Sequence, residues 1–273
     1  MWSLVALLTD YGYVDTYVAE VKARILSYRR DVQIVDVTHG VASFNELEAA
    51  FLLRNASRSF PDGTIFICII DPKVGTGRRS IIIKTRRGKL FIGPDTGFMI
   101  PAAKEHEIEN VWVIDENKLP GRISETFHGR DVFAEAAGRI LAGEEIENMS
   151  YEVDGYEVME LPRPRVRDGR IEAMVMHVDK FGNIITNIHA GDYGFEGLFG
   201  SRLRVRLGRS GKTLTAPLVK SYGAVKKGSP LLTVGGSGYV ELSVNMGDAS
   251  KRYRVKPGDK IVVEIGRLNV YQT

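Results

Sequence analysis

The chain has 273 residues, 44% of them hydrophobic and 26% charged, so it can bury one large core or two smaller ones. Its 37 basic residues barely exceed its 34 acidic ones, which gives little support to nucleic-acid binding. The single cysteine, Cys68, lies in an apolar run, which fits a buried side chain in a reducing compartment. The amino-terminal apolar stretch is too short for a signal peptide or a membrane span, so we expect a cytoplasmic protein with no membrane partner.

The first half of the chain alternates strand-like and helix-like segments. Short apolar runs predict strands at residues 4–8, 33–37, 64–70, 80–84, 90–92 and 111–114. Apolar residues three and four apart predict a helix capped by Asp15, a second capped by Ser43 with Phe44 and Phe51 on one face, and a third over 132–141. This alternation predicts an α/β domain over residues 1–160, with a mostly parallel sheet flanked by helices.

The second half has a different character. Residues 144–169 are acidic and then rich in proline and arginine, which predicts an extended, solvated connector. From Ile171 the helical period disappears, and glycine-rich turns separate strands expected at residues 173–178, 203–207, 231–234, 239–244 and 260–265. The pattern predicts a smaller all-β, barrel-like carboxyl-terminal domain over residues 170–273.

Polar residues that follow the strands of the first half are the candidates for chemistry. Asp10 and Asp71 directly follow apolar strands, and in parallel sheets ligands gather beyond the carboxyl ends of the strands. Each aspartate alone could equally be a turn residue or a helix cap, but Asp95 in a third turn favours a shared site. Arg78 and His128 lie on glycine-containing loops, and an aspartate, an arginine and a histidine can together activate water.

Other polar residues carry weaker signals. His39 lies near a strand end and is more simply structural, and no histidine has metal-ligand spacing, so we expect no metal. In the second half, residues 179–183 offer a carboxylate, an aromatic ring and an amide, although hairpin chemistry alone would explain the glycine and asparagine. Tyr222 and Tyr239 could each stack on a flat ring, but packing is the simpler interpretation.

Seven short segments, in this order, resemble one protein family over nearly the whole chain. They are Leu8-Thr-Asp-Tyr-Gly12, Ile34-Val-Asp-Val-Thr-His39, Ile70-Asp-Pro-Lys-Val-Gly-Thr-Gly-Arg-Arg79, Gly93-Pro-Asp-Thr-Gly97, Thr126-Phe-His-Gly-Arg-Asp131, Val178-Asp-Lys-Phe-Gly-Asn183 and Glu241-Leu-Ser-Val-Asn-Met-Gly247. The chain therefore resembles the S-adenosylmethionine hydroxide adenosyltransferases, relatives of the fluorinase and the chlorinase.

The resemblance implies an enzyme that hydrolyses S-adenosyl-L-methionine to adenosine and L-methionine, by attack of activated water at the ribose C5′. It implies no cofactor, because S-adenosylmethionine is the small-molecule substrate. Asp71, Arg78 and His128 match the family's water-activating triad. The substrate-binding positions that it implies are Asp10 at the ribose hydroxyls, Asp15 and Asp179 near the methionine amino group, and Phe181, Asn183, Tyr222, Ser237, Glu241, Asn245 and Met246. It also implies a homotrimer with each ligand between two subunits.

Three positions depart from the family's pattern and bear mainly on the methionine end of the substrate. Lys73 replaces a glycine, Thr96 replaces an asparagine, and Gly236 replaces the serine that contacts the methionine carboxylate, with Ser237 one place later. A halogenase that uses S-adenosylmethionine and a non-catalytic binding module remain alternatives. Halogenases of this superfamily lack the water-activating triad, and a binding module would have no use for Arg78 and His128.

Overall fold

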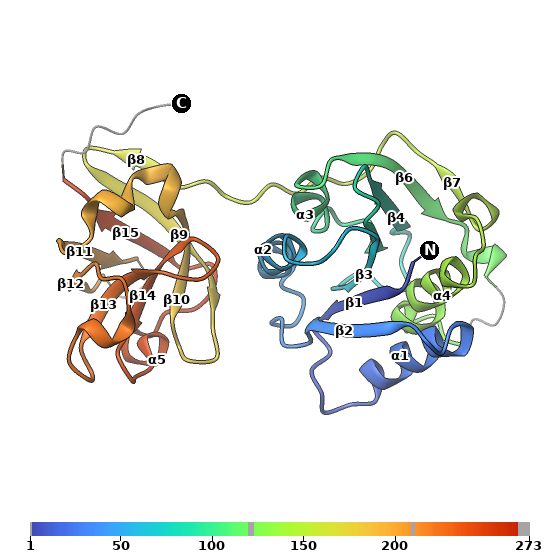
Figure 1. The fold of residues 1–273 in the computed structure, drawn as a ribbon, viewed down its shortest axis with the longest axis horizontal. Coiled ribbons are helices and arrows are strands. Elements are labelled where there is room, and N and C mark those ends of the chain that lie inside the picture. Colours follow the sequence, from blue (N-terminus) through green and yellow to red (C-terminus); the bar gives the residue numbers. More distant parts are fainter. Residues whose placement is uncertain (1, 120–122, 209–210, 267–273) are drawn as a thin grey trace. The chain divides into compact units, whose positions relative to one another are not determined.

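The computed structural model describes residues 2–119, 123–208 and 211–266 (Figure 1). The chain divides into two compact units, Met1–Leu161 and Pro162–Thr273, and each has its own sheet and its own apolar core. Among the described residues, no helix has the length and apolar character needed to cross a membrane.

The amino-terminal unit is built on a seven-stranded sheet in the order β2-β1-β3-β5-β4-β6-β7. The strands are β1 (Leu4–Thr9), β2 (Gln33–Thr38), β3 (Thr64–Ile69), β4 (Ser80–Thr85), β5 (Leu90–Pro94), β6 (Ile108–Ile114) and β7 (Ser150–Glu152). All six predicted strands are present, and β7 is an addition of three residues.

The sheet is mixed. Strands β2, β1, β3 and β5 pair in parallel, whereas β4 pairs antiparallel with β5 and β6, and β7 pairs antiparallel with β6. Only residues 86–89 separate β4 from β5. A connection this short permits an antiparallel hairpin, because a parallel pair needs a crossover of about a dozen residues or more.

Helices cover both faces of this sheet, as predicted. Helices α1 (Tyr17–Tyr28) and α4 (Glu135–Leu141) share one core with Val5 and Leu7 of β1. Helices α2 (Glu46–Ser57) and α3 (Ile100–Lys104) lie on the other side of the sheet (Figure 1). They share the other core with Ala6 and Leu8, so alternate residues of β1 serve opposite faces. Helix α4 is preceded by a wide π-helical turn at Gly129–Ala134, so the helical segment begins three residues earlier than predicted; α3 was not predicted.

Both predicted helix caps are wrong. Helix α1 begins after Thr16, and Asp15 is exposed one residue further out. Helix α2 is capped by Asn45, whose side-chain oxygen accepts a first-turn backbone N–H, and Ser43 lies outside the helix. Phe44 also precedes α2, is 68% exposed and has a φ of 64°, so it does not share the buried face. Several neighbouring side chains could cap each helix, and only the path of the backbone selects one.

The carboxyl-terminal unit is an antiparallel, barrel-like sheet in the order β12-β11-β15-β9-β10-β14-β13, with β8 paired to β9. The strands are β8 (Arg165–Arg167), β9 (Arg170–Val178), β10 (Ile184–His189), β11 (Arg202–Leu207), β12 (Thr213–Pro217), β13 (Pro230–Val234), β14 (Tyr239–Val244) and β15 (Lys260–Glu264). A bridge between Leu218 and Leu232 nearly closes the barrel. The five predicted strands are present; β8, β10 and β12 are additions.

The remaining elements are short. Helix α5 (Ala249–Tyr253) packs in the second unit, and 3-10 turns lie at Glu116–Lys118, Ile146–Asn148, Ala190–Tyr193, Phe195–Leu198 and Tyr222–Ala224. The predicted connector over 144–169 is shorter in the structure. Its longest stretch without helix or strand is residues 153–164, because β7 and β8 form on either side of that stretch.

Candidate active site

A pocket of about 650 Å³ lies beyond the carboxyl ends of β1 and β3 in the amino-terminal unit. Its walls come from the turn after β1, the first turn of α1, the loop before α2, the loop after β3 and residues 123–130. Parallel strands end together at this edge of the sheet, so polar residues that follow them converge there. Asp10 follows β1 and Asp71 follows β3, and both line the pocket.

The structure brings Asp71, Arg78 and His128 together at this pocket. The Arg78 Nε donates to Asp71 Oδ1 at 2.9 Å, and its Nη2 donates to Asp71 Oδ2. The same Nη2 donates to His128 Nδ1 at 2.9 Å. The three side chains are between 4% and 8% exposed, and Asp71 and His128 line the pocket while Arg78 lies behind them. A bidentate contact of this kind fixes the plane of the carboxylate.

Arg78 uses all of its hydrogen-bonding nitrogens in this cluster. Its Nη1 donates to Ser80 Oγ at 2.7 Å and to the Arg79 carbonyl at 3.2 Å, and Ser80 in turn donates to Glu116 Oε1 at 2.8 Å. A guanidinium has donors and no acceptor, so His128 Nδ1 is the acceptor of its bond. The imidazole that accepts there is neutral and carries its proton on Nε2.

Asp10 lies in the same pocket, and a backbone hydrogen bond fixes one of its carboxylate oxygens. Its Oδ2 accepts the backbone N–H of Phe44 at 2.9 Å. Burial raises the pKa of Asp10, the Phe44 N–H lowers it, and the charge of Asp71 raises it further, with a net upward shift. A carboxylate in this setting can accept hydrogen bonds from a ligand's hydroxyl groups.

Three aromatic rings form one wall of the pocket. The centroid of the Tyr17 ring lies 5.2 Å from that of Phe127 and 5.4 Å from that of Tyr11. Gly129 lies against this wall, since a Cβ atom added to Gly129 would lie 2.5 Å from the Tyr11 hydroxyl. These aromatic residues were not predicted from the sequence. Tyr11 and Phe127 each directly adjoin a predicted site residue, Asp10 and His128, which is a usable signal.

Other candidates of the first half lie away from the pocket lining. Asp15 is exposed and does not line it. Asp95 is buried and accepts a hydrogen bond from Arg79 Nε at 2.8 Å, so it does not join Asp10 and Asp71. His39 is buried beside Asp36, whose Oδ1 lies 3.1 Å from its Nε2, and burial lowers the pKa of His39. Its setting is structural, in line with the sequence analysis.

A second polar cluster lies in the carboxyl-terminal unit, at the turn between β9 and β10. Asp179 Oδ1 accepts the backbone N–H groups of Phe181 and Asn183, each at 2.9 Å, and its Oδ2 accepts the Asn183 side-chain amide at 2.7 Å. The turn requires Gly182, which has a φ of 83° and packs against Asp248. Asn183 is buried, whereas the Phe181 ring is 75% exposed.

Tyr222 and Glu241 belong to the same unit. The Tyr222 hydroxyl donates to Glu241 Oε2 at 2.8 Å. Burial raises the pKa of both groups, and the charge of Asp179 raises both further. Gly235 approaches the Glu241 carboxyl so closely that a side chain would not fit there.

The last three predicted positions lie near the ends of β13 and β14. Asn245 donates its side-chain amide to the Val225 carbonyl at 2.7 Å. Met246 follows with a φ of 51° and is 77% exposed, and Ser237 is exposed in the turn between the two strands. Eight of the ten predicted substrate-binding residues therefore belong to the second unit, and only Asp10 and Asp15 to the first.

Among the described residues, no group of three or more histidine, cysteine, aspartate and glutamate side chains is arranged to hold a metal ion.

The network of Ser80 and Glu116 behind Arg78 was not predicted. No local motif marks it, because Glu116 is 36 residues from Ser80 and is brought there only by the packing of the sheet.

Comparison with protein families finds a match in each of the two units. The model of the SAM hydroxide adenosyltransferase N-terminal domain matches residues 5–150, and that of the C-terminal domain matches residues 173–262. The chain belongs to the SAM hydroxide adenosyltransferase family. The two matched regions fall on either side of residues 153–164, which lack regular structure.

Individual relatives resemble the chain along almost its full length. An (R)-S-adenosyl-L-methionine hydrolase of Methanocaldococcus jannaschii is 34% identical over 266 residues, 95% of each chain. A fluorinase of an Actinoplanes species is 26% identical and covers 95% of this chain and 97% of its own length. The crystal structure of an uncharacterized conserved protein from Thermotoga maritima is similar with a TM-score of 0.88, at 35% identity over 96% of this chain and 100% of that chain.

Proposed function

We propose that this protein hydrolyses S-adenosyl-L-methionine to adenosine and L-methionine. The observation that carries the proposal is the Asp71–Arg78–His128 cluster, which lines or supports the pocket that also holds Asp10. Relatives that align with almost the whole chain are named (R)-S-adenosyl-L-methionine hydrolases. We therefore take the (R) configuration at the sulfonium as the preferred substrate, and no cofactor enters the reaction.

The reaction is a displacement at the ribose C5′. A water oxygen forms a bond to C5′ while the C5′–S bond breaks, and the electron pair of that bond goes to sulfur. The sulfonium leaves as a neutral thioether, so no acid has to protonate it. Water must lose one proton, and Asp71 is the base, with its carboxylate held by Arg78 at the pocket wall.

His128 serves a different role from a general base. Its Nδ1 accepts from Arg78, so its Nε2 carries hydrogen and orients the water as a donor. Asp10 binds the ribose hydroxyls and, with Asp71, places C5′ in line with the water; such positioning is worth several kcal/mol, roughly 7–11 in the best intramolecular cases. Attraction between the sulfonium and these carboxylates must stay modest, because the positive charge disappears in the transition state.

In this proposal the protein is a cytoplasmic homotrimer. The second polar cluster of one subunit completes the site of a neighbouring subunit. Asp179, Asn183, Tyr222 and Glu241, with Phe181, Ser237 and the Asn245–Met246 backbone, contact the adenosine and the methionine from a neighbouring subunit. Large exposed apolar side chains support an interface, since Phe181 and Met246 in one unit and Tyr13 and Phe44 in the other are each at least 68% exposed. When Asp71→Asn subunits are mixed with Asn183→Ala subunits, part of the activity should be restored. If the subunits are shown to exchange and no activity returns, the proposal that each site is shared between two subunits is wrong.

Product analysis tests the reaction. The pure protein is incubated with the (R) and (S) epimers of S-adenosylmethionine in ¹⁸O-labelled water, with and without chloride or fluoride. We expect adenosine labelled at its 5′ oxygen and methionine without halide, formed faster from the (R) epimer. Halogenated adenosine would support a halogenase, and tight binding without turnover would support a binding module. His128→Ala and Asp71→Ala should lose turnover while adenosine binding survives in calorimetry.

A further inference from the structure

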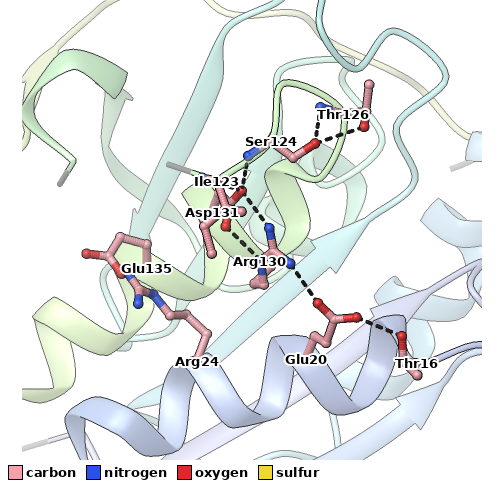
Figure 2. Close-up of polar contacts among 9 residues, drawn as sticks. All are labelled: Thr16, Glu20, Arg24, Ile123, Ser124, Thr126, Arg130, Asp131 and Glu135. Carbon is pink, nitrogen blue, oxygen red and sulfur yellow. Dashed lines mark hydrogen bonds and ion pairs between the residues drawn. The ribbon is translucent and has the colours of Figure 1, made fainter. Parts of the chain in front are cut away.

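A charged network on the pocket wall has no part in the reaction steps above (Figure 2). Arg130, in the π-helical turn that follows His128, bridges two carboxylates. Its Nη1 donates to Glu20 Oε2 at 2.6 Å, while its Nε and Nη2 donate to Asp131 Oδ1 and Oδ2 at 2.7 and 3.0 Å. We call Glu20, Arg130 and Asp131 the clamp.

Each carboxylate of the clamp holds a further segment of the pocket wall (Figure 2). Asp131 Oδ2 accepts the backbone N–H groups of Ile123 and Ser124 at 3.1 and 2.8 Å. Glu20 Oε1 accepts the hydroxyl of Thr16, the residue before α1, at 2.7 Å. The clamp therefore connects the start of α1, the loop at 123–126 and the turn that begins directly after His128.

The clamp is anchored at its buried end. The Asp131 side chain is 2% exposed, that of Arg130 is 17% exposed and that of Glu20 is 37% exposed. Burial alone would raise the pKa of Asp131, but Arg130 and the two backbone N–H groups lower it below its usual value. A buried ionised carboxylate is strongly destabilising without its partner, so the Asp131–Arg130 contact contributes to the stability of this turn.

The position of His128 depends on this turn. His128 directs Nδ1 toward Arg78, whereas Arg130, two residues later, reaches α1 on another side of the turn. Gly129 between them packs against Tyr11, so the turn is held from three directions. Arg130 also lies over the Phe127 ring, with 4.8 Å from its central carbon to the ring centroid, and so steadies the aromatic wall.

We propose that the clamp is a positioning device that sets the place of His128 and of the pocket wall during hydrolysis, an inference that rests on the proposed function. Arg130 is a positioning residue and has no bond to the substrate in this proposal. A side chain displaced by about 1 Å can cost about 100-fold in rate, so a loosened clamp should lower turnover without a comparable loss of binding.

The chain contains a matched control. Arg24, one turn further along α1, donates to Glu135 Oε2 at 2.6 Å, and the Glu135 side chain is fully buried (Figure 2). This pair also joins α1 to the segment after His128, but neither residue lines the pocket. If joining the two helices were the whole role of the clamp, both pairs would matter equally.

The test compares Arg130→Lys, Glu20→Gln and Arg24→Lys in the full-length protein. Lysine keeps the charge but cannot bridge two carboxylates with a planar fork, whereas at position 24 it can still reach its single partner. We expect Arg130→Lys to lower kcat per site by about 10- to 100-fold with KM within about threefold of the unaltered protein. Glu20→Gln should have a smaller effect in the same direction, and Arg24→Lys should leave kcat within about twofold.

Sites are counted by adenosine titration, so that an unfolded fraction does not count as lost turnover. The clamp is refuted if Arg130→Lys keeps kcat within twofold, or if Arg24→Lys loses as much as Arg130→Lys. A raised KM at unchanged kcat would also overturn it, since that result would mean that Arg130 binds the substrate. Absence of turnover by the unaltered protein with either epimer would instead overturn the proposed function itself.

Discussion

Arg78→Lys is the sharpest test of the cluster at the pocket. Arg78 makes five hydrogen bonds: two to Asp71 and one each to His128, Ser80 and the Arg79 carbonyl. A lysine ammonium has three donors, so at least two of these bonds must be lost. Hydrogen bonds to charged groups contribute about 1.5–3 kcal/mol each, which gives a total loss of about 3–6 kcal/mol.

This loss divides between folding and catalysis. If half of it appears in the transition state, about 1.5–3 kcal/mol, then kcat/KM falls by about 10- to 150-fold. The remainder should appear as a lower thermal midpoint, because the Arg78 side chain is only 4% exposed and water cannot replace the lost partners. Adenosine formation followed by chromatography gives kcat/KM, and thermal unfolding followed by circular dichroism gives the midpoint.

The neighbouring residue supplies the control. Arg79 lies on the same loop and pairs with Asp95, but its side chain is 39% exposed and does not line the pocket. Arg79→Lys should therefore leave kcat/KM within about threefold, since partly exposed ion pairs contribute about 0–1 kcal/mol. If Arg78→Lys keeps more than half of the kcat/KM of the unaltered protein while remaining folded, the reasoning from its five bonds is wrong.

Three further predictions follow from other contacts. Asp10→Asn should weaken adenosine binding in calorimetry by about 10- to 100-fold, because charge-assisted bonds to the ribose are lost; unchanged affinity would remove Asp10 from the site. Gly129→Ala should lower the thermal midpoint by overpacking against the Tyr11 hydroxyl, at a cost of about 1–3 kcal/mol, and Tyr11→Phe should restore part of it. Glu241→Gln should stabilise the protein at alkaline pH and not at acidic pH. The folded-state pKa of Glu241 is raised, so the unaltered protein loses stability as pH rises from the unfolded pKa through the folded one. A midpoint difference that does not change with pH would contradict this sign.

Much of the fold followed from local pattern. The run of Thr64–Ile69 is buried at every position, and short, almost wholly apolar runs are typical of strands covered on both faces. In β11, by contrast, Leu203 and Val205 are buried while Arg204 is exposed, the alternation of a barrel with one wet face. The prediction failed at boundaries, at caps and at several whole elements, namely α3, β7, β8, β10 and β12. Asp15 and Ser43 are good capping residues by type, but their neighbours Thr16 and Asn45 occupy the cap positions.

The candidate site was predictable only in part. Asp10 and Asp71 were found because residues after parallel strands must meet at one edge of the sheet. Asp95 follows a strand of the same sheet, yet its pairing with Arg79 takes it out of the pocket. Ser80 and Glu116 escaped notice because their roles depend on a contact across the sheet, and no residue near either of them in sequence signals it.

The sequence by itself determined the class of each unit, the edge of the sheet where polar residues converge, and the residue types available for activating water. These depend on the periodicity of apolar side chains and on the direction of short connections, which are local properties. Only the tertiary structure decided that Arg78 bonds both Asp71 and His128, so that the imidazole donates rather than accepts toward the pocket. It alone decided that Arg130 faces α1. Both outcomes depend on which side chains satisfy the buried donors of an arginine, and that is settled by packing between segments up to 110 residues apart.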